Sequence, residues 1–445
     1  MEDKIKVFLT ARDTDDRLTE KKPLTFEDDP EGIELRVINV YDDVEYQEMI
    51  GFGGAFTEAA AYTLQKLPED KQEEVLAAYF DEKKGHRYTF CRTHMNSSDF
   101  ALGNYACVEK EGDVELESFN IERDKKYIIP MIKAAARYGK FHLFISPWSP
   151  PGWMKDTGIM NRGGKLLPQY RDAWARHFAR FIKAYENEGI PVWGLTVQNE
   201  PKAVQTWDSC IFTAEEEKDF VRDYLGPVLE REGLGHIKIM IWDHNKERIY
   251  ERAKVAFEDP EAAKYIWGVA FHWYSGDHFE ALEAVHHKWP DKPMALTECC
   301  VGFGGRLDPW SKGERYGHDI IGNLNNYMSA WCDWNLILDE KGGPNHVHNY
   351  CEAPIMIDTR VGTIEYKPSY YYIGHFSRFI EPGSVRIGFS RYTEKLKCTA
   401  FKTPSGGKVL IVMNDTDDNI PFVLRYNDKI AKCESVAHSI MTLVF

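Results

Sequence analysis

Two glutamates stand at the ends of short apolar runs, where a strand would leave its last side chain at the edge of a sheet. Residues 192–198 finish in Asn199-Glu200-Pro201, and residues 294–297 lead directly into Glu298. The residue before a proline is disfavoured in the α region, so we expect Pro201 to hold Glu200 extended and outside the next helix. A pair of carboxylates facing one bond can serve as nucleophile and general acid/base on a glycoside.

Each glutamate alone also has a simpler explanation, because a strand-end Glu can cap a loop or pair with an arginine. The two lie 98 positions apart, so they become partners only in a fold that gathers strand ends. Retaining glycosidases hold the two carboxyl groups about 5–5.5 Å apart. We expect a cation to keep Glu298 ionised and the charge of Glu298 to raise the pKa of Glu200, with Arg92 as the candidate cation.

The elements that would position these residues alternate between short apolar runs and longer amphipathic segments, which indicates βα units and a parallel sheet. Residues 168–188 and 215–232 have helical periodicity, the first opening at Pro168 and the second stopping at Gly233. Eight strands would close into a (β/α)₈ barrel, whose active site lies at the carboxyl ends of the strands. The expected strands are residues 50–56, 88–92, 142–146, 192–198, 237–242, 268–273, 294–298 and 328–334.

Both ends of the chain have a different pattern, with short β-like pieces separated by turns. These pieces are residues 6–9 and 33–37 near the start, and residues 408–413 and 421–424 around the turn 414–419 near the end. We therefore expect an α/β protein in which residues 47–379 form the TIM barrel, and residues 1–46 and 380–445 together form a side β-sandwich.

Aromatic residues gather at the same predicted strand ends, where flat rings could stack on the apolar faces of a sugar. Large aromatics are also often buried as core. The residues concerned are Trp148, Trp273, Tyr274, Trp331 and Trp334.

The composition of the chain excludes some classes of binding partner and indicates a compartment. The 445 residues carry a formal net charge of −15 without a long basic run, which argues against nucleic acid and anionic membrane surfaces. The N-terminus lacks a signal-peptide pattern, and no apolar stretch is long enough for a membrane span. Nine scattered cysteines indicate reduced thiols, so we expect a cytoplasmic protein. No pattern specifies an oligomeric state.

Two further motifs do not support cofactor chemistry. The segment Gly51-Phe52-Gly53-Gly54 begins like a dinucleotide fingerprint, but Phe56 stands where its last glycine should be. The pair His346 and His348 lacks the spacing of a known metal motif. We therefore expect neither a metal nor a cofactor.

Taken together, these motifs resemble glycoside hydrolase family 30, especially its glucosylceramidase branch and the bacterial relatives of that branch. The matching motifs run in order from about residue 46 to 390. They are residues 50–57, Arg92 with 98–100, 146–149, 196–201, 271–274, 296–298, 334–336, 342–345 and 374–377.

The resemblance implies a retaining mechanism on a small β-glycoside or glycolipid, with Glu298 as nucleophile and Glu200 as acid/base. It implies that Asn199 holds the sugar 2-hydroxyl. Residues expected to line the glycone pocket are Asp99, Trp148, Trp331 and Asn345. Residues expected to orient and tune the carboxylates are Arg92, His272 and Tyr274.

The chain also departs from the lysosomal branch. It has no Cys before Cys91, and His346 stands where that branch has Trp. Trp207 and the segment Asp243-His244-Asn245 are closer to bacterial members, and we expect all of these residues to shape the aglycone side.

The leading hypothesis is a bacterial exo-acting β-glucosidase of glucosylceramidase type. The alternatives are a β-1,6-glucanase, β-xylosidase or β-fucosidase of the same family, or a carbohydrate-binding relative without catalysis.

Overall fold

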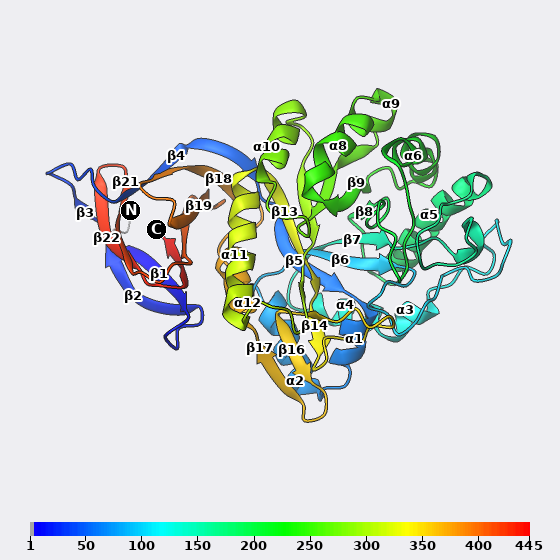
Figure 1. Cartoon of the computed structure of the whole chain (residues 1–445), viewed down its shortest axis with the longest axis horizontal. Helices are drawn as coiled ribbons and strands as arrows, with labels where there is room; N and C mark the ends of the chain where they lie inside the picture. Colours follow the sequence, from blue (N-terminus) through cyan, green and yellow to red (C-terminus); the bar gives the residue numbers. More distant parts are fainter. Residues whose placement is uncertain (1–3) are drawn as a thin grey trace.

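The structure is a computed structural model that describes residues 4–445. Met1, Glu2 and Asp3, which begin the N-terminal segment without a signal-peptide pattern, lie outside the described residues. The larger half of the structure is a closed barrel of eight parallel strands (Figure 1). Each predicted strand overlaps one of them, so the barrel is confirmed. The strands are β5 (Gly51–Phe56), β6 (Phe90–Met95), β7 (His142–Pro147), β8 (Gly194–Thr196), β9 (Lys238–Asn245), β10 (Ile266–His272), β11 (Met294–Glu298) and β13 (Met328–Asn335).

The barrel is filled by side chains and is not a pore. Phe90, Phe144 and Met240 meet small residues from the opposite strands in one buried cluster. Gly53 lets β5 lie against β6, because a Cβ there would come within 1.8 Å of the Phe90 carbonyl oxygen. The glycines of this segment therefore serve close strand packing.

Helices surround the barrel and most of them bury an apolar face against it, as the amphipathic patterns predict (Figure 1). They are α1 (Glu58–Leu64), α2 (Glu69–Phe80), α3 (Glu122–Lys126), α4 (Ile128–Ala135), α5 (Arg171–Asn187), α6 (Ala214–Phe220), α7 (Gly226–Arg231), α8 (Ile249–Phe257), α9 (Pro260–Ala263), α10 (Phe279–Lys288), α11 (Pro309–Asn325) and α12 (Pro368–Ser377). Short turns are η1 (Gly152–Met154), η2 (Pro168–Tyr170), η3 (Val221–Leu225) and η4 (Lys246–Arg248).

The helix predicted over residues 215–232 contains an internal π turn, η3, between α6 and α7. The Gly226 N–H donates to the Val221 carbonyl, five residues earlier. Pro227 follows at once, and a proline lacks an N–H and crowds the carbonyl four residues before it. The wider turn accommodates that proline without ending the helix, which runs on to Arg231.

Both ends of the chain contribute to a separate ten-stranded sheet, as expected (Figure 1). Its order is β2-β1-β23-β20-β19-β18-β4-β21-β22-β3, and it has its own apolar core. The strands are β1 (Lys4–Ala11), β2 (Thr19–Thr25), β3 (Glu27–Asp28), β4 (Val37–Glu48), β18 (Val385–Arg391), β19 (Leu396–Lys402), β20 (Lys408–Asn414), β21 (Ile420–Tyr426), β22 (Lys429–Ser435) and β23 (Ser439–Val444).

The predicted strand over residues 33–37 is wrong. The strand β4 begins only at Val37, and Leu35 is 80% exposed in the turn before it. Three apolar residues in five suggested a strand, but only Val37, the first residue of β4, is buried, and Ile33 is only partly so. The polar strand β2 was missed because its alternation is weak; it is an edge strand paired only with β1.

Two small sheets lie in the loops that follow β11 and β13. One pairs β12 (Val301–Gly302) with β15 (Cys351–Glu352), and the other joins β14 (Ile337–Asp339), β16 (Ile355–Asp358) and β17 (Thr363–Tyr366). They brace long loops at the carboxyl end of the barrel. Across residues 4–445, no helix combines the length and apolar character needed to cross a membrane.

His375 joins the barrel to the ten-stranded sheet. It lies on α12, fully buried, and its ring bonds the Thr442 hydroxyl at 2.8 Å and the Thr10 hydroxyl at 2.9 Å. Burial lowers the pKa of His375 to about 3, so the ring is neutral and uses one nitrogen as donor and the other as acceptor.

Replacing this histidine should weaken the junction. We expect His375→Ala to lower the free energy of unfolding by about 2–4 kcal/mol, since it removes two buried hydrogen bonds and leaves a cavity. Urea unfolding would measure the change. The exposed His236→Ala is the control and should stay within about 0.5 kcal/mol of wild type. Equal stability of the two variants would contradict this role.

Candidate active site

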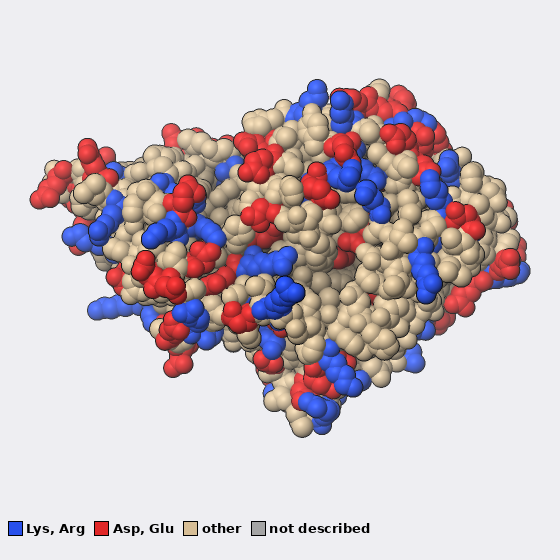
Figure 2. Space-filling model, viewed as in Figure 1, with Lys and Arg blue, Asp and Glu red and all other residues tan. Residues whose placement is uncertain are grey.

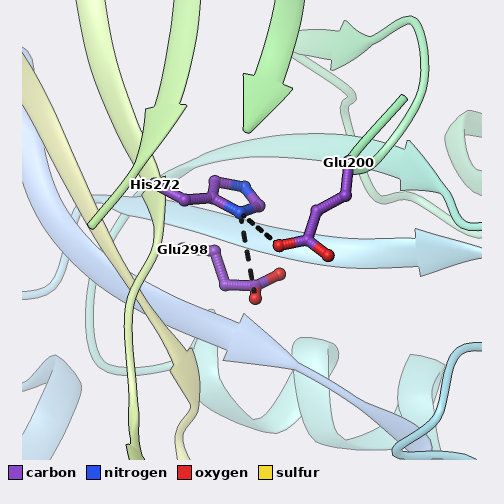
Figure 3. Close-up of side chains that lie close together, drawn as sticks. All are labelled: Glu200, His272 and Glu298. Atoms are coloured by element: carbon purple, nitrogen blue, oxygen red, sulfur yellow. Dashed lines mark hydrogen bonds and ion pairs between the residues drawn. The ribbon is translucent and has the colours of Figure 1, made fainter. Parts of the chain in front are cut away.

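The two glutamates meet at the carboxyl end of the barrel. Glu200 follows β8 and Glu298 ends β11, and one carboxylate oxygen of each lies within 4.8 Å of the other and of a ring nitrogen of His272. Figure 3 shows the carboxylates approaching the His272 ring from different strands. A gap this short fits direct attack on a sugar, whereas inverting enzymes separate their carboxyl groups by about 6.5–9.5 Å.

The backbone of Glu200 is not extended, so the prediction drawn from Pro201 is wrong. Its φ is +47°, in the left-handed region. The Glu200 N–H donates to the Asp243 carbonyl at 2.9 Å and its own carbonyl accepts from Ala203 at 2.8 Å. These bonds outweigh the local preference, and they keep Glu200 out of a helix as expected. Strained backbone of this kind is found at functional sites.

Arg92, at 0% exposure on β6, organises the site. Nη1 donates to Glu298 Oε2 at 2.7 Å, and Nη2 donates to Asp243 Oδ2 at 2.7 Å and Asn199 Oδ1 at 3.0 Å. Nε donates to the Ser146 hydroxyl at 3.0 Å. The guanidinium therefore fixes one oxygen of Glu298 and carries the positive charge beside it that the sequence predicted.

Asp243 lies beneath the two glutamates and was not recognised from the sequence, which assigned its segment to the aglycone side. Its side chain is fully buried and accepts from Arg92, His272 and the hydroxyl of Thr297. Asp243 has a φ of 52°, so the end of β9 turns its carboxylate inward. A useful signal would have been an acidic residue directly after the apolar run of a barrel strand.

His272, at the end of β10, lies between three carboxylates. Its Nε2 is 2.9 Å from Asp243 Oδ1, and its Nδ1 is 3.3 Å from Glu200 Oε1 and 4.0 Å from Glu298 Oε1. Burial opposes the charged ring, but the charge of Glu298 and the bonds to Asp243 and Glu200 outweigh it and raise the pKa of His272 to about 9.

The pKa values of the two glutamates run opposite to the expected order. Burial raises the pKa of both, but the bond from His272 and the positive charge of its ring leave the pKa of Glu200 below its ordinary value. For Glu298, burial with the charges of Glu200 and Asp243 outweighs His272 and Arg92, and its pKa lies above its ordinary value. The expectation failed because it left out a protonated His272.

One transferable proton explains this pattern. His272 Nδ1 and Glu200 Oε1 are 3.3 Å apart, and the low pKa of the carboxyl with the high pKa of the ring favours a proton on the ring that can pass to the carboxyl. Meanwhile both oxygens of Glu298 accept from other donors, Oε2 from Arg92 and Oε1 from the Tyr274 hydroxyl at 2.9 Å. The arrangement can therefore offer a proton from one side and an oriented carboxylate from the other.

The opposite wall of the site centres on Asp99. Its Oδ2 accepts from the Asn345 amide at 3.2 Å and the Asn349 amide at 3.0 Å. Burial, supported by the charge of Glu298, raises the pKa of Asp99 to about 7 although the Asn349 bond opposes this. Asn345 also closes the local turn through Val347 and Asn349. Asn349 was missed, although it stands four residues beyond the predicted Asn345.

Two stacked tryptophans form the aromatic wall. Trp148 and Trp334 have ring centroids 4.9 Å apart at 15°, and the Arg92 guanidinium lies 4.6 Å from the Trp148 ring centroid. The expected pocket role of Trp331 is wrong. It is fully buried against Phe52 and Tyr316 in the core around the barrel. Side chains alternate along β13, so Trp331 and Trp334, three residues apart, point to opposite faces. Trp334 is therefore the tryptophan of this strand that lies beside Trp148 at the site.

The remaining predicted residues lie around the same end of the barrel. Trp207 is partly buried against the Trp148 and Trp334 cluster. His244 Nε2 is 3.8 Å from Glu200 Oε1, and burial lowers the pKa of His244 to about 4. His346 Nε2 lies 3.4 Å from the buried Asp208. Within residues 4–445, the one group of three or more side chains with metal-ligating geometry is Glu200, His272 and Glu298 themselves.

A (β/α)₈ barrel that brings two glutamates together beside stacked aromatic rings defines a glycoside hydrolase. Family models match the chain in two consecutive parts, the glycosyl hydrolase family 30 TIM-barrel domain over residues 49–380 and the family 30 β-sandwich domain over residues 383–443. The chain therefore belongs to glycosyl hydrolase family 30, whose mechanism is retaining.

Relatives of this chain cover nearly all of it. Lysosomal acid glucosylceramidase of Mus musculus is 33% identical over 87% of this chain and 79% of its own length. The solved structure of SrfJ from Salmonella typhimurium is 36% identical, with a TM-score of 0.96 and 99% of both chains covered. The endo-β1,6-glucanase BT3312 is 28% identical, with a TM-score of 0.90 and the same coverage.

The proton shared by His272 and Glu200 predicts the alkaline limb of the pH profile. Above the His272 pKa of about 9 this proton is lost and activity should fall. Asp243→Asn removes an anion that favours the protonated ring, so the limb should move to lower pH by about one unit or more.

The measurement is kcat/KM against pH on a β-glycoside with a poor leaving group, where proton donation matters. Asp124→Asn is the control, since Asp124 is also fully buried but hydrogen-bonds Tyr105 and Tyr185 away from the glutamates. If the alkaline limb of the kcat/KM profile of Asp243→Asn lies at the same pH as that of wild type, the shared-proton model is wrong, whatever the absolute rate of the variant.

Proposed function

We propose that this protein is an exo-acting β-glucosidase of glucosylceramidase type, with Glu298 as nucleophile and Glu200 as general acid/base. The observation that carries the assignment of roles is the difference in their hydrogen-bond partners. Glu298 is held at both oxygens by Arg92 and Tyr274, which suits an anion fixed for attack. Glu200 faces His272, with which it shares a proton.

In the first step the Glu298 carboxylate attacks the anomeric carbon while Glu200 protonates the departing oxygen. The proton reaches Glu200 from His272 Nδ1, and Asp243 holds the ring in place through Nε2. In the second step Glu200 takes a proton from water, and the resulting hydroxide displaces Glu298 from the sugar. Arg92 stabilises the Glu298 carboxylate as it leaves.

The glycone would lie between Asp99 and the stacked Trp148 and Trp334. A carboxyl group with two amide neighbours can bond adjacent sugar hydroxyls, and the aromatic faces suit the C–H face of the ring. Asn199 would hold the 2-hydroxyl, because Arg92 fixes its side-chain oxygen beside Glu298.

The loops after β10, β11 and β13 offer an apolar aglycone side. Tyr274, Phe303, Leu307 and Tyr350 are each more than a third exposed on these loops, and the Phe303 N–H donates to the Tyr350 carbonyl at 3.1 Å. Figure 2 shows a hollow in the barrel half of one face, surrounded largely by uncharged surface. Exposed apolar side chains beside a polar pocket favour a glycolipid over a soluble oligosaccharide.

A second candidate activity is β-1,6-glucanase, favoured by the likeness to BT3312. A panel containing glucosylceramide, aryl β-glucosides, xylosides and fucosides, and a β-1,6-glucan would separate the two. Free glucose from glucosylceramide supports the proposal, and oligosaccharides from the glucan alone would overturn it.

We also infer that the protein works in a reducing compartment, as in a bacterial cytoplasm. All nine cysteines are free thiols, and eight of them are buried. Buried thiols are stable where disulfides do not form.

The nucleophile assignment predicts a large loss and a specific rescue. Glu298→Gln should lower kcat by about 10³-fold or more, since it removes a covalent catalyst. Azide should restore turnover to Glu298→Gly and, because it replaces the nucleophile from the same side, give a glycosyl azide of inverted configuration. The matched variant Glu352→Gln removes a buried glutamate paired with Lys312 and should keep most activity. Residual Glu298→Gln turnover within about tenfold of wild type would exclude this role.

The aglycone proposal predicts a difference between substrates. Phe303→Ser should raise KM for a glucoside with a long alkyl chain by about tenfold, the cost of losing one large apolar contact, and leave KM for methyl β-glucoside unchanged. Steady-state kinetics on both substrates measures the effect. Leu35→Ser changes an exposed residue in the turn before β4, part of the ten-stranded sheet, and serves as control. Equal changes on the two substrates would refute an apolar aglycone side.

A further inference from the structure

Two thiols meet beside the nucleophile. Cys300, two residues after Glu298, has its Sγ 3.4 Å from the Sγ of Cys351. The contact joins two separate loops, because Cys300 precedes β12 and Cys351 begins β15, and these strands pair with each other. We propose that Cys300 and Cys351 form a dithiol site that a peroxide oxidises to a disulfide, which slows the enzyme reversibly.

The positions of the two sulfurs favour bond formation. A disulfide needs its sulfurs about 2.05 Å apart, so they have to approach by little more than an ångström, and the paired strands already hold their backbones together. Cys300 is partly exposed, whereas Cys351 is 6% exposed. Cys300 is therefore the thiol that meets the oxidant, and Cys351 is the resolving thiol.

The chemical steps balance. The Cys300 thiolate attacks one peroxide oxygen, the O–O bond breaks, and a sulfenic acid and water form once a proton is taken up. The Cys351 thiol then attacks the sulfenic sulfur, releasing a second water as the S–S bond forms. In total the two thiols lose two electrons and two protons, and hydrogen peroxide becomes two waters.

The site also sets when oxidation occurs. The bond to Cys351, together with burial and the charge of Glu298, holds the pKa of Cys300 well above its ordinary range. Since the thiolate is the reactive form, oxidation is slow at neutral pH and accelerates as pH rises. The dithiol therefore resists brief exposure and responds to sustained peroxide.

A chain of polar contacts connects the thiols to Glu298. The Tyr274 hydroxyl donates to Glu298 Oε1 at 2.9 Å and lies 3.4 Å from Cys300 Sγ. Forming the disulfide draws the Cys300 sulfur toward Cys351 and away from the Tyr274 hydroxyl, so Tyr274 loses a neighbour that fixes its position. We expect kcat to fall about fivefold, the effect of one weakened hydrogen bond. This effect rests on the proposed role of Glu298, whereas the disulfide itself does not.

Mass analysis of the full chain tests the chemistry. After hydrogen peroxide at pH 8.5, alkylation of free thiols and digestion without reductant, we expect a peptide pair joined through Cys300 and Cys351 with two hydrogens lost. It should form in step with the loss of activity, and dithiothreitol should reverse both. Absence of this linked pair would overturn the dithiol site and leave the proposed function standing. If the linked pair forms but kcat is unchanged, the disulfide does not act on Glu298 and the proposed regulation is wrong.

Two variants distinguish disulfide formation between Cys300 and Cys351 from oxidation elsewhere in the chain. Cys351→Ala has no resolving thiol, so prolonged peroxide should carry Cys300 to sulfinic acid and cause a loss that dithiothreitol no longer reverses. Cys433→Ala, which removes a thiol of the ten-stranded sheet, should behave as wild type. A reversible loss in Cys351→Ala equal to that of wild type would overturn the proposal.

Discussion

The buried guanidinium of Arg92 is the constraint on which the rest of the site depends. Moving a charge out of water costs several kcal/mol even after relaxation, unless it is paired and its donors are satisfied. Arg92 meets this condition through two carboxylates, one amide oxygen, one hydroxyl and the Thr297 carbonyl, which come from four other segments of the barrel. Its neighbours must therefore be in register before the charge can be buried at all.

That requirement links the chemistry to the strands. Asp243 bridges Arg92 and His272, so the end of β9 connects the cation on β6 to the imidazole on β10. Positive φ at Asp243 and Glu200 shows that the backbone departs from regular strand geometry to bring these carboxylates inward. Such strain persists only where surrounding structure fixes it, and a closed barrel supplies that structure.

The sequence was sufficient for the barrel and for the two glutamates, because strand-end position depends only on a local apolar pattern. It was not sufficient for properties that depend on which side chains lie next to each other in the folded protein. Trp331 and Trp334 both looked like pocket residues, and only the register of β13 separates them. The pKa order of Glu200 and Glu298 depends on His272, whose charge depends in turn on Asp243.

In the proposed mechanism, reaction and selectivity belong to different parts of the chain. Arg92 lies within β6, Asp243, His272 and Glu298 lie in the last residues of β9, β10 and β11, and Glu200 follows β8 by four residues. Phe303, Cys300, Asn349 and Cys351 lie on the two long loops after β11 and β13, which are joined by the short pairing of β12 with β15 and a few contacts beside it. On this proposal, the loops select the aglycone and the strand ends hold the carboxylates. The two parts meet at Tyr274, whose hydroxyl contacts both Glu298 and the loop thiol of Cys300.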